Sequence, residues 1–393
     1  MTVSPLAVTA LAVLLGWVWL VTLHGRFWRA DQRLGRPPEP LRWPAVVAVV
    51  PARDEAEHVG AAMASLLAQD YEGEFRVVLV DDDSADGTAE AARSGAQRSG
   101  RLTVMTGRPL EPGWTGKLWA VNQGLNAAAV IAPDAAYVLF TDADIAHDPA
   151  NLRRLVAKAE TDGLDLVSLM VRLRCRTLWE KLLIPAFVFF FQKLYPFPWV
   201  NNPHRRTAAA AGGCMLVRRA TLARIGGIAA IADRVIDDCA LAAAIKSGRG
   251  TVWLGLADSD GPRSLRGYDG LGGIWHMVAR SAYVQLRHSP RLLAGTVAGM
   301  VLLYALPPLA LIVGLLAGDP LAAALGGAGW AVMWACWRPT LEDYGVPHLA
   351  GLLLPLAAML YLAMTIDSAR RTRAGRGGAW KGRTYAPDSA KAE

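Results

Sequence analysis

Between residues 45 and 140 the chain alternates short, continuously apolar runs with longer stretches of helical periodicity. A short apolar run without polar alternation is typical of a strand buried on both faces of a sheet. The predicted strands are Ala45–Val50, Phe75–Val80, Leu102–Met105 and Ala136–Phe140, and the predicted helices are Glu55–Gln69, Thr88–Ser99 and Leu118–Ala129. Because strands that alternate with helices form parallel sheets with right-handed crossovers, the pattern predicts an α/β domain.

Both ends of the chain carry apolar segments. Leu6–Leu23 has about the 20 residues that a spanning helix needs. A secretory signal peptide is the alternative, but Met1–Pro5 carries no charged side chain and the basic residues follow the apolar run. Toward the C-terminus, Leu292–Ala317 and Val346–Ile366 are long enough to span, whereas Leu321–Trp337 is shorter and rich in glycine. A domain and a basic tail on the same side of a membrane require an even number of these C-terminal segments to cross.

These features divide the chain into regions. They are an N-terminal transmembrane anchor (1–25), a basic Pro-rich linker (26–44), the α/β domain (45–290), a C-terminal transmembrane region (291–367) and a basic disordered tail (368–393). Within the domain, residues 178–200 mix aromatic side chains with prolines, which suits an interfacial segment in the headgroup region better than a straight span. A buried core helix is the alternative for this segment.

Composition and charge agree with membrane association. Hydrophobic residues make up 53% of the 393 residues, charged residues make up 19%, and the mean hydropathy is +0.25. The formal net charge is +7, and basic residues gather just after the two apolar ends. Positive charge beside a membrane helix marks its cytoplasmic side. We therefore expect a membrane partner, a domain that faces the cytoplasm, and no nucleic-acid partner.

Polar clusters follow the carboxyl ends of the predicted strands, where ligands bind in parallel sheets. Pro51–Glu55 follows the first strand, Asp81–Thr88 follows the second, and Thr141–Asp144 follows the fourth. Alternate residues of an extended segment point the same way, so Asp142 and Asp144 can face one divalent cation. Mg²⁺ or Mn²⁺ held there would neutralise a nucleotide diphosphate as it leaves. An acidic loop that caps the next helix is the alternative.

Further residues are candidates for the same site. One carboxylate of Asp81–Asp83 can accept from a base or a ribose hydroxyl, or else the cluster is a turn that caps a helix. Lys117 lies in a glycine-containing loop that could approach phosphates, although the P-loop pattern is absent. Asp238 precedes an Ala-rich helix, where it is either a general base or an acid that favours the helix dipole. A nicotinamide enzyme is disfavoured because no GxGxxG follows the first two strands.

Taken in order, the motifs PARDE, VDDDSADGT, GWTGK and TDAD and the acidic pair before a helix resemble the inverting family 2 glycosyltransferases. The similarity runs from about Ala45 to Arg287, and the whole chain resembles the hopene-associated glycosyltransferases of bacterial hopanoid clusters. The resemblance implies a GT-A fold with a mixed, mainly parallel sheet and a multi-pass protein of the bacterial inner (cytoplasmic) membrane. It also implies inverting transfer of one sugar from a nucleotide-sugar, with a UDP-sugar favoured, to a membrane lipid hydroxyl, expected to be that of a hopanoid. Transfer to polyprenyl phosphate or another membrane lipid, and a non-catalytic membrane scaffold, are the alternatives.

The resemblance also assigns roles to residues. Nucleotide-sugar binding is implied for Pro51, Arg53, Glu55, Asp81, Asp82, Asp83, Lys117, Asp142 and Arg280, metal binding for Asp142 and Asp144, and the role of general base for Asp238. His147 either approaches the metal or phosphate or is a satisfied loop residue. Two departures from the family pattern are Asp54, where the family often has Asn, and Met277–Ser281, which lacks the Gln and Trp of the processive QxxRW motif. The second departure favours single-sugar transfer over polymer synthesis.

Overall fold

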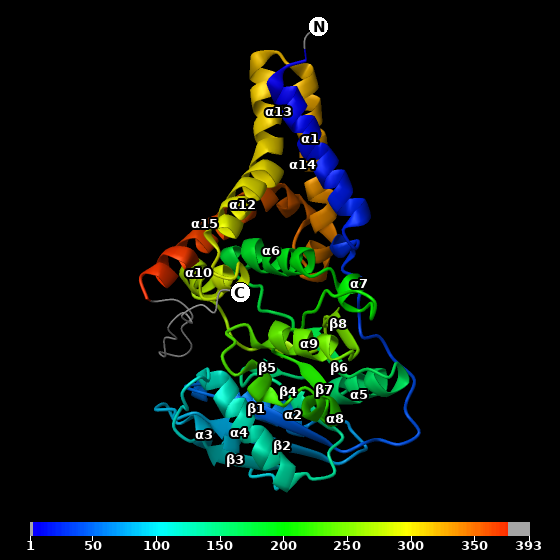
Figure 1. Ribbon diagram of the computed structural model, residues 1–393, viewed down its shortest axis with the longest axis vertical. Helices are drawn as coiled ribbons and strands as arrows, with labels where there is room; N and C mark the ends of the chain where they lie inside the picture. The colour runs from blue at the N-terminus through cyan, green and yellow to red at the C-terminus, as the bar shows by residue number, and fades with distance from the viewer. Residues whose placement is uncertain (1–2, 376–393) are drawn as a thin grey trace.

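The computed structural model describes residues 3–375, and a mixed seven-stranded sheet forms the lower part of the molecule in Figure 1. Its order is β3-β2-β1-β4-β7-β6-β8. The strands are β1 (Val46–Ala52), β2 (Phe75–Asp81), β3 (Leu102–Thr106), β4 (Tyr137–Phe140), β6 (Leu166–Met170), β7 (Met215–Arg218) and β8 (Val252–Leu256). Only β7 runs antiparallel to its neighbours, β4 and β6. The prediction of a mixed, mainly parallel sheet is therefore confirmed.

Helices cover both faces of this sheet, which explains why its strands are apolar throughout. Every residue of β1 is buried. Val47 and Val49 pack in the core that includes α4, whereas Ala48 and Val50 pack on the opposite face in the core that includes α2. The domain helices are α2 (Ala56–Leu67), α3 (Thr88–Gly95), α4 (Gly116–Ile131), α5 (Asn151–Thr161), α8 (Arg219–Arg224), α9 (Asp237–Ser247) and the 3₁₀ helix η2 (Ile228–Ile231).

The parallel register brings the carboxyl ends of β1, β2 and β4 to one edge of the sheet. Ala52 pairs with Asp81, and Asp82 N donates to Ala52 O over 2.8 Å. Beyond β4 the chain forms β5 (Ile145–Ala146), which pairs with β9 (Arg263–Ser264) as a separate antiparallel ladder. Residues distant in sequence thus meet at the edge where the polar clusters lie.

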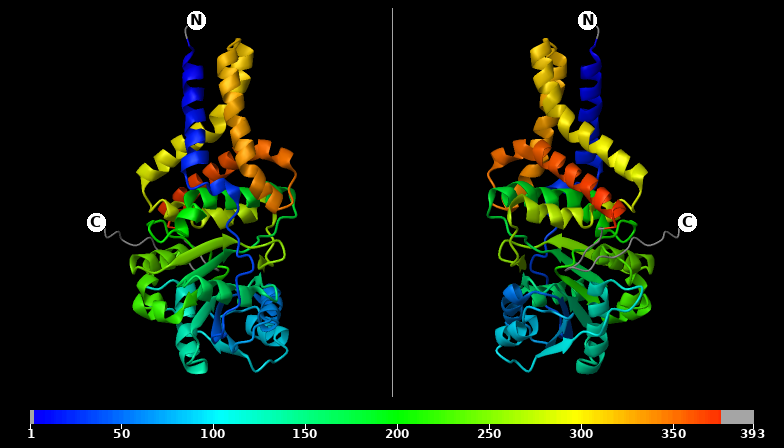
Figure 2. Two further views of the ribbon diagram at one scale, coloured as in Figure 1. Left: turned by 90° about the vertical axis from the view of Figure 1, so that its right-hand side faces the viewer. Right: turned by 90° about the vertical axis from the view of Figure 1, so that its left-hand side faces the viewer.

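Three helices project together from the domain along the long axis of the molecule (Figures 1 and 2). They are α1 (Pro5–Leu23), α13 (Leu306–Ala317) and α14 (Pro320–Asp343), and α12 (Pro290–Met300) leads into α13 through the π-helical segment η3 (Val301–Ala305). At the far end, the Ser4 hydroxyl donates to the Asp319 carboxylate. At the domain end of α14, Asp343 forms an ion pair with Arg33 over 2.5 Å.

A second group of helices lies across this axis, between the projecting helices and the sheet (Figures 1 and 2). We call α6 (Leu178–Leu194), α10 (Gly270–Ala279) and α15 (Leu354–Arg373) the transverse layer. The Tyr361 hydroxyl of α15 donates to Leu183 O of α6 over 2.8 Å, and Trp275 Nε1 of α10 donates to Asp367 of α15 over 2.8 Å. Short elements complete the described chain: η1 (Phe27–Arg29), α7 (Phe197–Val200), α11 (Ala282–Gln285) and η4 (His348–Leu353).

The described helices include candidate membrane spans. By length and composition, these are Pro5–Leu23, Leu178–Val200, Pro290–Ala317 and His348–Arg373. The boundary predicted for the tail, residue 368, needs correction because α15 continues to Arg373. Ser368 Oγ accepts from Tyr283 N over 3.0 Å, which holds this turn in place. The disorder predicted for the rest of the tail concerns residues 376–393, which lie outside the described residues.

A single hydrophobic cluster connects the sheet with the transverse and projecting helices. It contains Val47 of β1, Leu183 of α6, Trp337 of α14 and Tyr361 of α15, each of which is buried. The projecting helices therefore share a core with the sheet domain.

The close approach of α2 and α3 generates a stability prediction. A Cβ added at Gly95 would lie 2.1 Å from the carbonyl oxygen of Gly60, so Gly95→Ala must push the two helices apart. We expect a loss of about 1–3 kcal/mol and a lower melting midpoint for the full chain in detergent. Gly100→Ala is the control, because a Cβ there meets nothing within 4 Å. An unchanged midpoint for Gly95→Ala would contradict the observed packing.

Candidate active site

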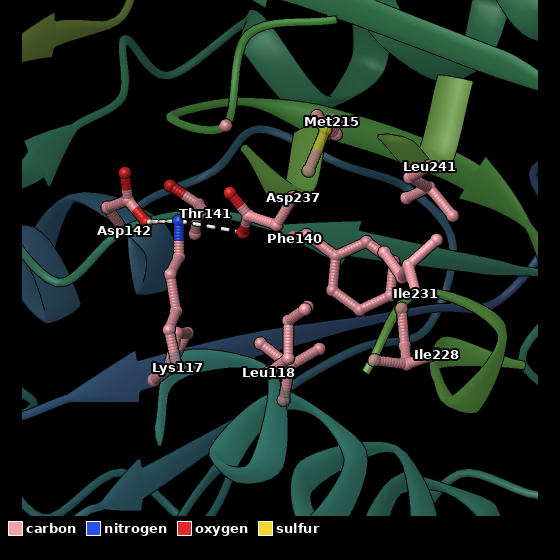
Figure 3. Close-up of a pocket in the computed structure, with 13 residues that line it drawn as sticks. Lys117, Leu118, Phe140, Thr141, Asp142, Met215, Ile228, Ile231, Asp237 and Leu241 are labelled. Atoms are coloured by element: carbon pink, nitrogen blue, oxygen red, sulfur yellow. Dashed lines mark ion pairs between the residues drawn. The ribbon is translucent and has the colours of Figure 1, made fainter. Parts of the chain in front are cut away.

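Three segments far apart in the sequence meet around the ammonium group of Lys117 (Figure 3). Lys117 lies in the first turn of α4, whose N-cap Thr115 accepts a hydrogen bond from Leu118 N. Lys117 Nζ is 2.9 Å from Asp142 Oδ1 and 3.1 Å from Asp237 Oδ2. Asp142 follows β4 and Asp237 begins α9, so this ammonium joins the sheet edge to a helix on the far side of the pocket.

The charged groups of this cluster shift one another's pKa values. Burial alone would lower the pKa of Lys117, but Asp142 and Asp237 outweigh it and raise that pKa. Burial raises the pKa of Asp142, and the neighbouring carboxylates Asp144 and Asp237 add to this, while Lys117 opposes it. The cluster therefore gathers several carboxylates around one ammonium group.

Asp238 is held beside this cluster by two backbone N–H groups. Gly212 N donates to Asp238 Oδ2 over 2.9 Å, and Cys239 N donates to Oδ1 over 2.7 Å. Burial and the adjacent Asp237 raise the pKa of Asp238 to about 6, although Lys117 and both N–H groups oppose the shift. A carboxyl with this pKa is ionised at neutral pH and still accepts a proton readily.

Asp144, the other predicted metal ligand, contacts an arginine that the sequence analysis missed. Arg266 Nε lies 2.9 Å from Asp144 Oδ2, and Arg266 Nη2 donates to Glu55 Oε1 over 2.6 Å. Burial opposes the charge of Arg266, but Glu55 and Asp144 outweigh it and raise the pKa of the guanidinium. The contact depends on the β5–β9 ladder, which pairs Ile145 with Ser264. No motif around Arg266 signals this pairing in the sequence.

The residues predicted to line a nucleoside pocket lie at the ends of β1 and β2. Arg53 Nη1 donates to Asp82 O and lies 3.7 Å from Asp82 Oδ2, and Asp82 is buried. A backbone N–H of the loop that follows β2 donates to Asp81 Oδ1 over 3.2 Å. Asp83, in the same loop, is exposed, and its φ of 58° lies in the left-handed region. Pro51 lines the pocket beside Lys117. Their contact with a nucleoside stays a prediction.

Arg280 and His147 lie apart from the Lys117 cluster. Arg280 is exposed at the end of α10, and within the described residues the lining of the Lys117 pocket does not include it. His147 is buried, with ring nitrogens 2.9 Å from Thr141 Oγ1 and 2.9 Å from Asn151 Nδ2. Burial lowers the pKa of His147 to about 4. Of the two alternatives for His147, this packing favours the satisfied loop residue.

The pocket beside Lys117 is lined largely by apolar side chains (Figure 3). Its lining includes Leu118, Val121, Phe140, Met215, Ile228, Ile231 and Leu241, contributed by α4, β4, β7, η2 and α9. The charged groups thus stand at the rim of an apolar floor, where electrostatic interactions are stronger than in water.

The carboxylates at the end of β4 fit a hard divalent cation. Mg²⁺ is usually bound by one or two carboxylates, with substrate phosphates completing its shell. The Asp142 and Asp144 side chains are 37% and 16% exposed, so both are open to a ligand. Among residues 3–375, no group of three or more His, Cys, Asp or Glu side chains forms a ready-made metal site. Metal binding by Asp142 and Asp144 stays a prediction.

Comparison with known proteins shows what part of this chain is similar to. Residues 47–226 match the family model described as glycosyl transferase family 2, and they contain β1 to β4, Lys117 and Asp142. The match covers less than half of the chain, and it supports the prediction that the chain is an enzyme of the glycosyltransferase class.

Individual relatives are more distant. "Glycosyltransferase AglE" of Haloferax volcanii is 28% identical over 125 residues, which are 32% of this chain and only 38% of that relative. Mannosyltransferase PcManGT from Pyrobaculum calidifontis, in complex with GDP-Man and Mn²⁺, has a TM-score of 0.54 at 20% identity. The alignment covers 93% of this chain and 98% of that chain, which supports the predicted GT-A fold. Mannosyl-3-phosphoglycerate synthase from Rubrobacter xylanophilus has a TM-score of 0.40 at 19% identity, over 68% of this chain and 77% of that chain.

The buried His147 generates a prediction of pH-dependent stability. Its pKa of about 4 in the folded protein lies below the ordinary value of 6.5, so its neutral form stabilises the fold above pH 6.5. This contribution, about 3 kcal/mol at most, is lost as the pH falls from 6.5 toward 4. We expect the melting midpoint of wild type to drop more over this range than that of His147→Gln. The exposed His204→Gln should follow wild type. Equal pH dependence of wild type and His147→Gln would refute the assignment.

Proposed function

We propose that the protein is a membrane-bound inverting glycosyltransferase that moves one sugar from a nucleotide-sugar donor to a hydroxyl of a membrane lipid. The observation that carries the proposal is the position of Asp238 beside Lys117 and Asp142, within a glycosyltransferase family 2 fold. In this proposal Asp238 is the general base, Lys117 is the phosphate-binding cation, and Asp142 and Asp144 are the metal-binding carboxylates.

The donor would bind across the carboxyl ends of β1, β2 and β4. Arg53 and Asp82 would contact the base or ribose, with help from Glu55 and the neighbouring carboxylates of the β2 end. Lys117 would contact the diphosphate. Mg²⁺ or Mn²⁺ bound by Asp142 and Asp144 would supply charge neutralisation at the leaving group. The complex of PcManGT with GDP-Man and Mn²⁺ supports a nucleotide-sugar and a divalent cation. A UDP-sugar is the donor that we propose for this chain.

The transfer step is a direct displacement. The acceptor oxygen forms a bond to the anomeric carbon on the face opposite the diphosphate, and the bond from that carbon to the diphosphate breaks. The acceptor proton passes to Asp238, whose oxygens are oriented by Gly212 N and Cys239 N. The nucleoside diphosphate leaves with the electron pair, and inversion follows from the single displacement.

The acceptor would reach the site from the bilayer surface. The transverse layer carries exposed apolar side chains, among them Leu178 at 85% and Leu356 at 50%. Tyr195, at the end of α6, interacts with the side chain of Cys239. Burial and the adjacent Asp238 raise the pKa of the Cys239 thiol. The transverse layer thus borders the base directly. The resemblance of the motifs makes a hopanoid the proposed acceptor, and polyprenyl phosphate or another membrane lipid is the alternative.

A donor and acceptor panel tests this function. We expect the full-length protein in nanodiscs to transfer a single sugar from one nucleotide-sugar to a component of a membrane lipid extract, detected by mass spectrometry. Asp238→Asn should lower kcat by about 10²-fold or more, because the acceptor proton loses its base. The wild-type rate should fall as the pH drops through about 6, where Asp238 becomes protonated.

The control for this variant is Asp233→Asn, which changes an exposed aspartate a few residues before α9. It should retain the wild-type rate. An unchanged rate in Asp238→Asn with a hydroxyl acceptor would remove Asp238 as base and favour a phosphate acceptor, which needs no strong base. Complete absence of transfer, with folding and nucleotide binding intact, would favour a non-catalytic scaffold.

We further propose that α1, the α12–α13 segment and α14 cross the bacterial inner membrane while the transverse layer lies on its cytoplasmic face. α1 has 19 residues, or about 28 Å of helix, which matches the hydrocarbon thickness. The α12–α13 segment and α14 are two crossings after the catalytic domain. Because two is an even number, the basic end of α15 lies on the same side of the membrane as the catalytic domain. The N-terminus and the α13–α14 turn then lie outside.

Cysteine labelling tests this topology. In spheroplasts, a membrane-impermeant maleimide should label Val3→Cys and Ala317→Cys in a Cys175→Ser background, but not Ala374→Cys. Permeabilised cells should show labelling at all three positions, which controls for reactivity. Labelling of Ala374→Cys in intact spheroplasts would refute the proposed topology.

A further inference from the structure

Each aspartate of the Asp142-Ala143-Asp144 element is paired with a cationic side chain from a distant part of the chain. Lys117 Nζ lies 2.9 Å from Asp142 Oδ1, and Arg266 Nε lies 2.9 Å from Asp144 Oδ2. The two carboxylates predicted to bind a divalent cation thus each have an internal cationic partner, although Asp237 shares Lys117 and Glu55 shares Arg266.

The position of Arg266 is fixed by the backbone around it. Leu265 N donates to Asp144 O over 2.8 Å, next to the β5–β9 ladder. Tyr268 N donates to the buried Glu180 of α6 over 3.1 Å. The guanidinium reaches both Asp144 and Glu55 and is 36% exposed. It is thus held at the junction of the predicted metal site and the predicted nucleoside pocket, with one side open to a ligand.

These contacts oppose a divalent cation that arrives alone. A metal ion at Asp144 must compete with a guanidinium for Oδ2 and is repelled by it. A diphosphate changes this balance because it brings negative charge with it. The planar fork of an arginine matches phosphate oxygens well, so Arg266 can turn from the carboxylates to the diphosphate.

We propose that Arg266 is a donor-binding residue that pairs with Asp144 until a nucleotide diphosphate arrives and then contacts the diphosphate. The divalent cation and the nucleotide consequently bind together rather than independently. The inference rests on the proposed glycosyltransferase function and extends it to the order in which the ligands bind.

Two binding measurements on the full-length protein in detergent test the proposal. The first is the affinity for Mn²⁺ alone, followed by electron paramagnetic resonance of the free ion. The second is the affinity for UDP and for GDP at saturating Mn²⁺, measured by calorimetry. In Arg266→Gln, Mn²⁺ alone should bind about 5-fold more tightly because a competing charge is gone. The nucleoside diphosphate should bind about 10-fold more weakly because a charged hydrogen bond is lost.

The affinities for Mn²⁺ and for the nucleoside diphosphate should therefore change in opposite directions. A merely structural role of the arginine would instead weaken both affinities. Arg266→Lys keeps the charge but loses the fork, so its Mn²⁺ affinity should stay near wild type while the nucleotide affinity falls. Arg263→Gln changes an exposed arginine on the same segment and should alter neither affinity. Affinities are compared only among variants whose melting midpoint is close to that of wild type, so that unfolding does not explain a change in affinity.

Unchanged or weaker binding of Mn²⁺ alone by Arg266→Gln would overturn the proposal, as would unchanged nucleotide affinity. The proposed function fails in a different way. If wild type neither binds nucleoside diphosphates nor transfers sugar, the glycosyltransferase assignment itself is lost. If wild type does both and Arg266→Gln behaves like wild type, only the role of Arg266 is lost.

Discussion

The ion pairs of Lys117 are the interaction on which the arrangement of the site depends. Asp142 comes from the sheet edge and Asp237 from α9, and no backbone ladder joins these two positions within the described chain. Their carboxylates would repel each other across an apolar pocket in which charge is poorly screened. One ammonium between them converts that repulsion into attraction and ties the sheet edge to the start of α9, whose Leu241 and Ile245 pack in the same core as β1. The neighbouring Asp238 is oriented separately, by hydrogen bonds from Gly212 N and Cys239 N.

Glu180 has a comparable role at the start of the transverse layer. This buried carboxylate accepts from Arg176 N and Thr177 N, which begins α6, and also from Tyr268 N on the segment that carries Arg266. Hydrogen bonds from Thr177, Arg176 and Tyr268 outweigh the effect of burial and lower the pKa of Glu180. The carboxylate therefore stays charged, and it couples the start of a transverse helix to the charged groups around Asp144.

The sequence alone predicts the elements whose signals are local. β1, β2, β3 and β4 begin and end within a few residues of the predicted runs, because a strand covered on both faces must be continuously apolar. Their parallel order then places Arg53, Asp82 and Asp142 at one edge. The elements that could not be predicted from the sequence are those that form through contacts between distant segments. The antiparallel β7 and the β5–β9 ladder have short strands without a distinctive pattern, so Arg266 was not recognised as a neighbour of Asp144.

The number of crossing helices was undecided for a related reason. Apolar length does not distinguish α13 or α14 from α15, because each is long or apolar enough to lie in lipid. The helices differ in their packing: Tyr361 and Asp367 fasten α15 across α6 and α10, whereas α14 packs against α1 and α13. The crossing of α14 and not of α15 is part of the proposed topology. Arg280 illustrates the opposite case, a residue named from a family motif whose exposed position gives no contact with the Lys117 cluster among the described residues.

The hydrophobic cluster that runs from Val47 of β1 to Trp337 of α14 has a practical consequence. In many membrane enzymes the catalytic part can be cut from its anchor and studied in water. Here such a cut would pass through the interior of the protein rather than through a linker. A fragment ending before Pro290 would lose α15 and leave the apolar faces of α6 and α10 uncovered, directly above the loop that carries Arg266. The projecting and transverse helices thus belong to the same scaffold as the sheet, and we expect the candidate active site to keep its shape only in the full chain.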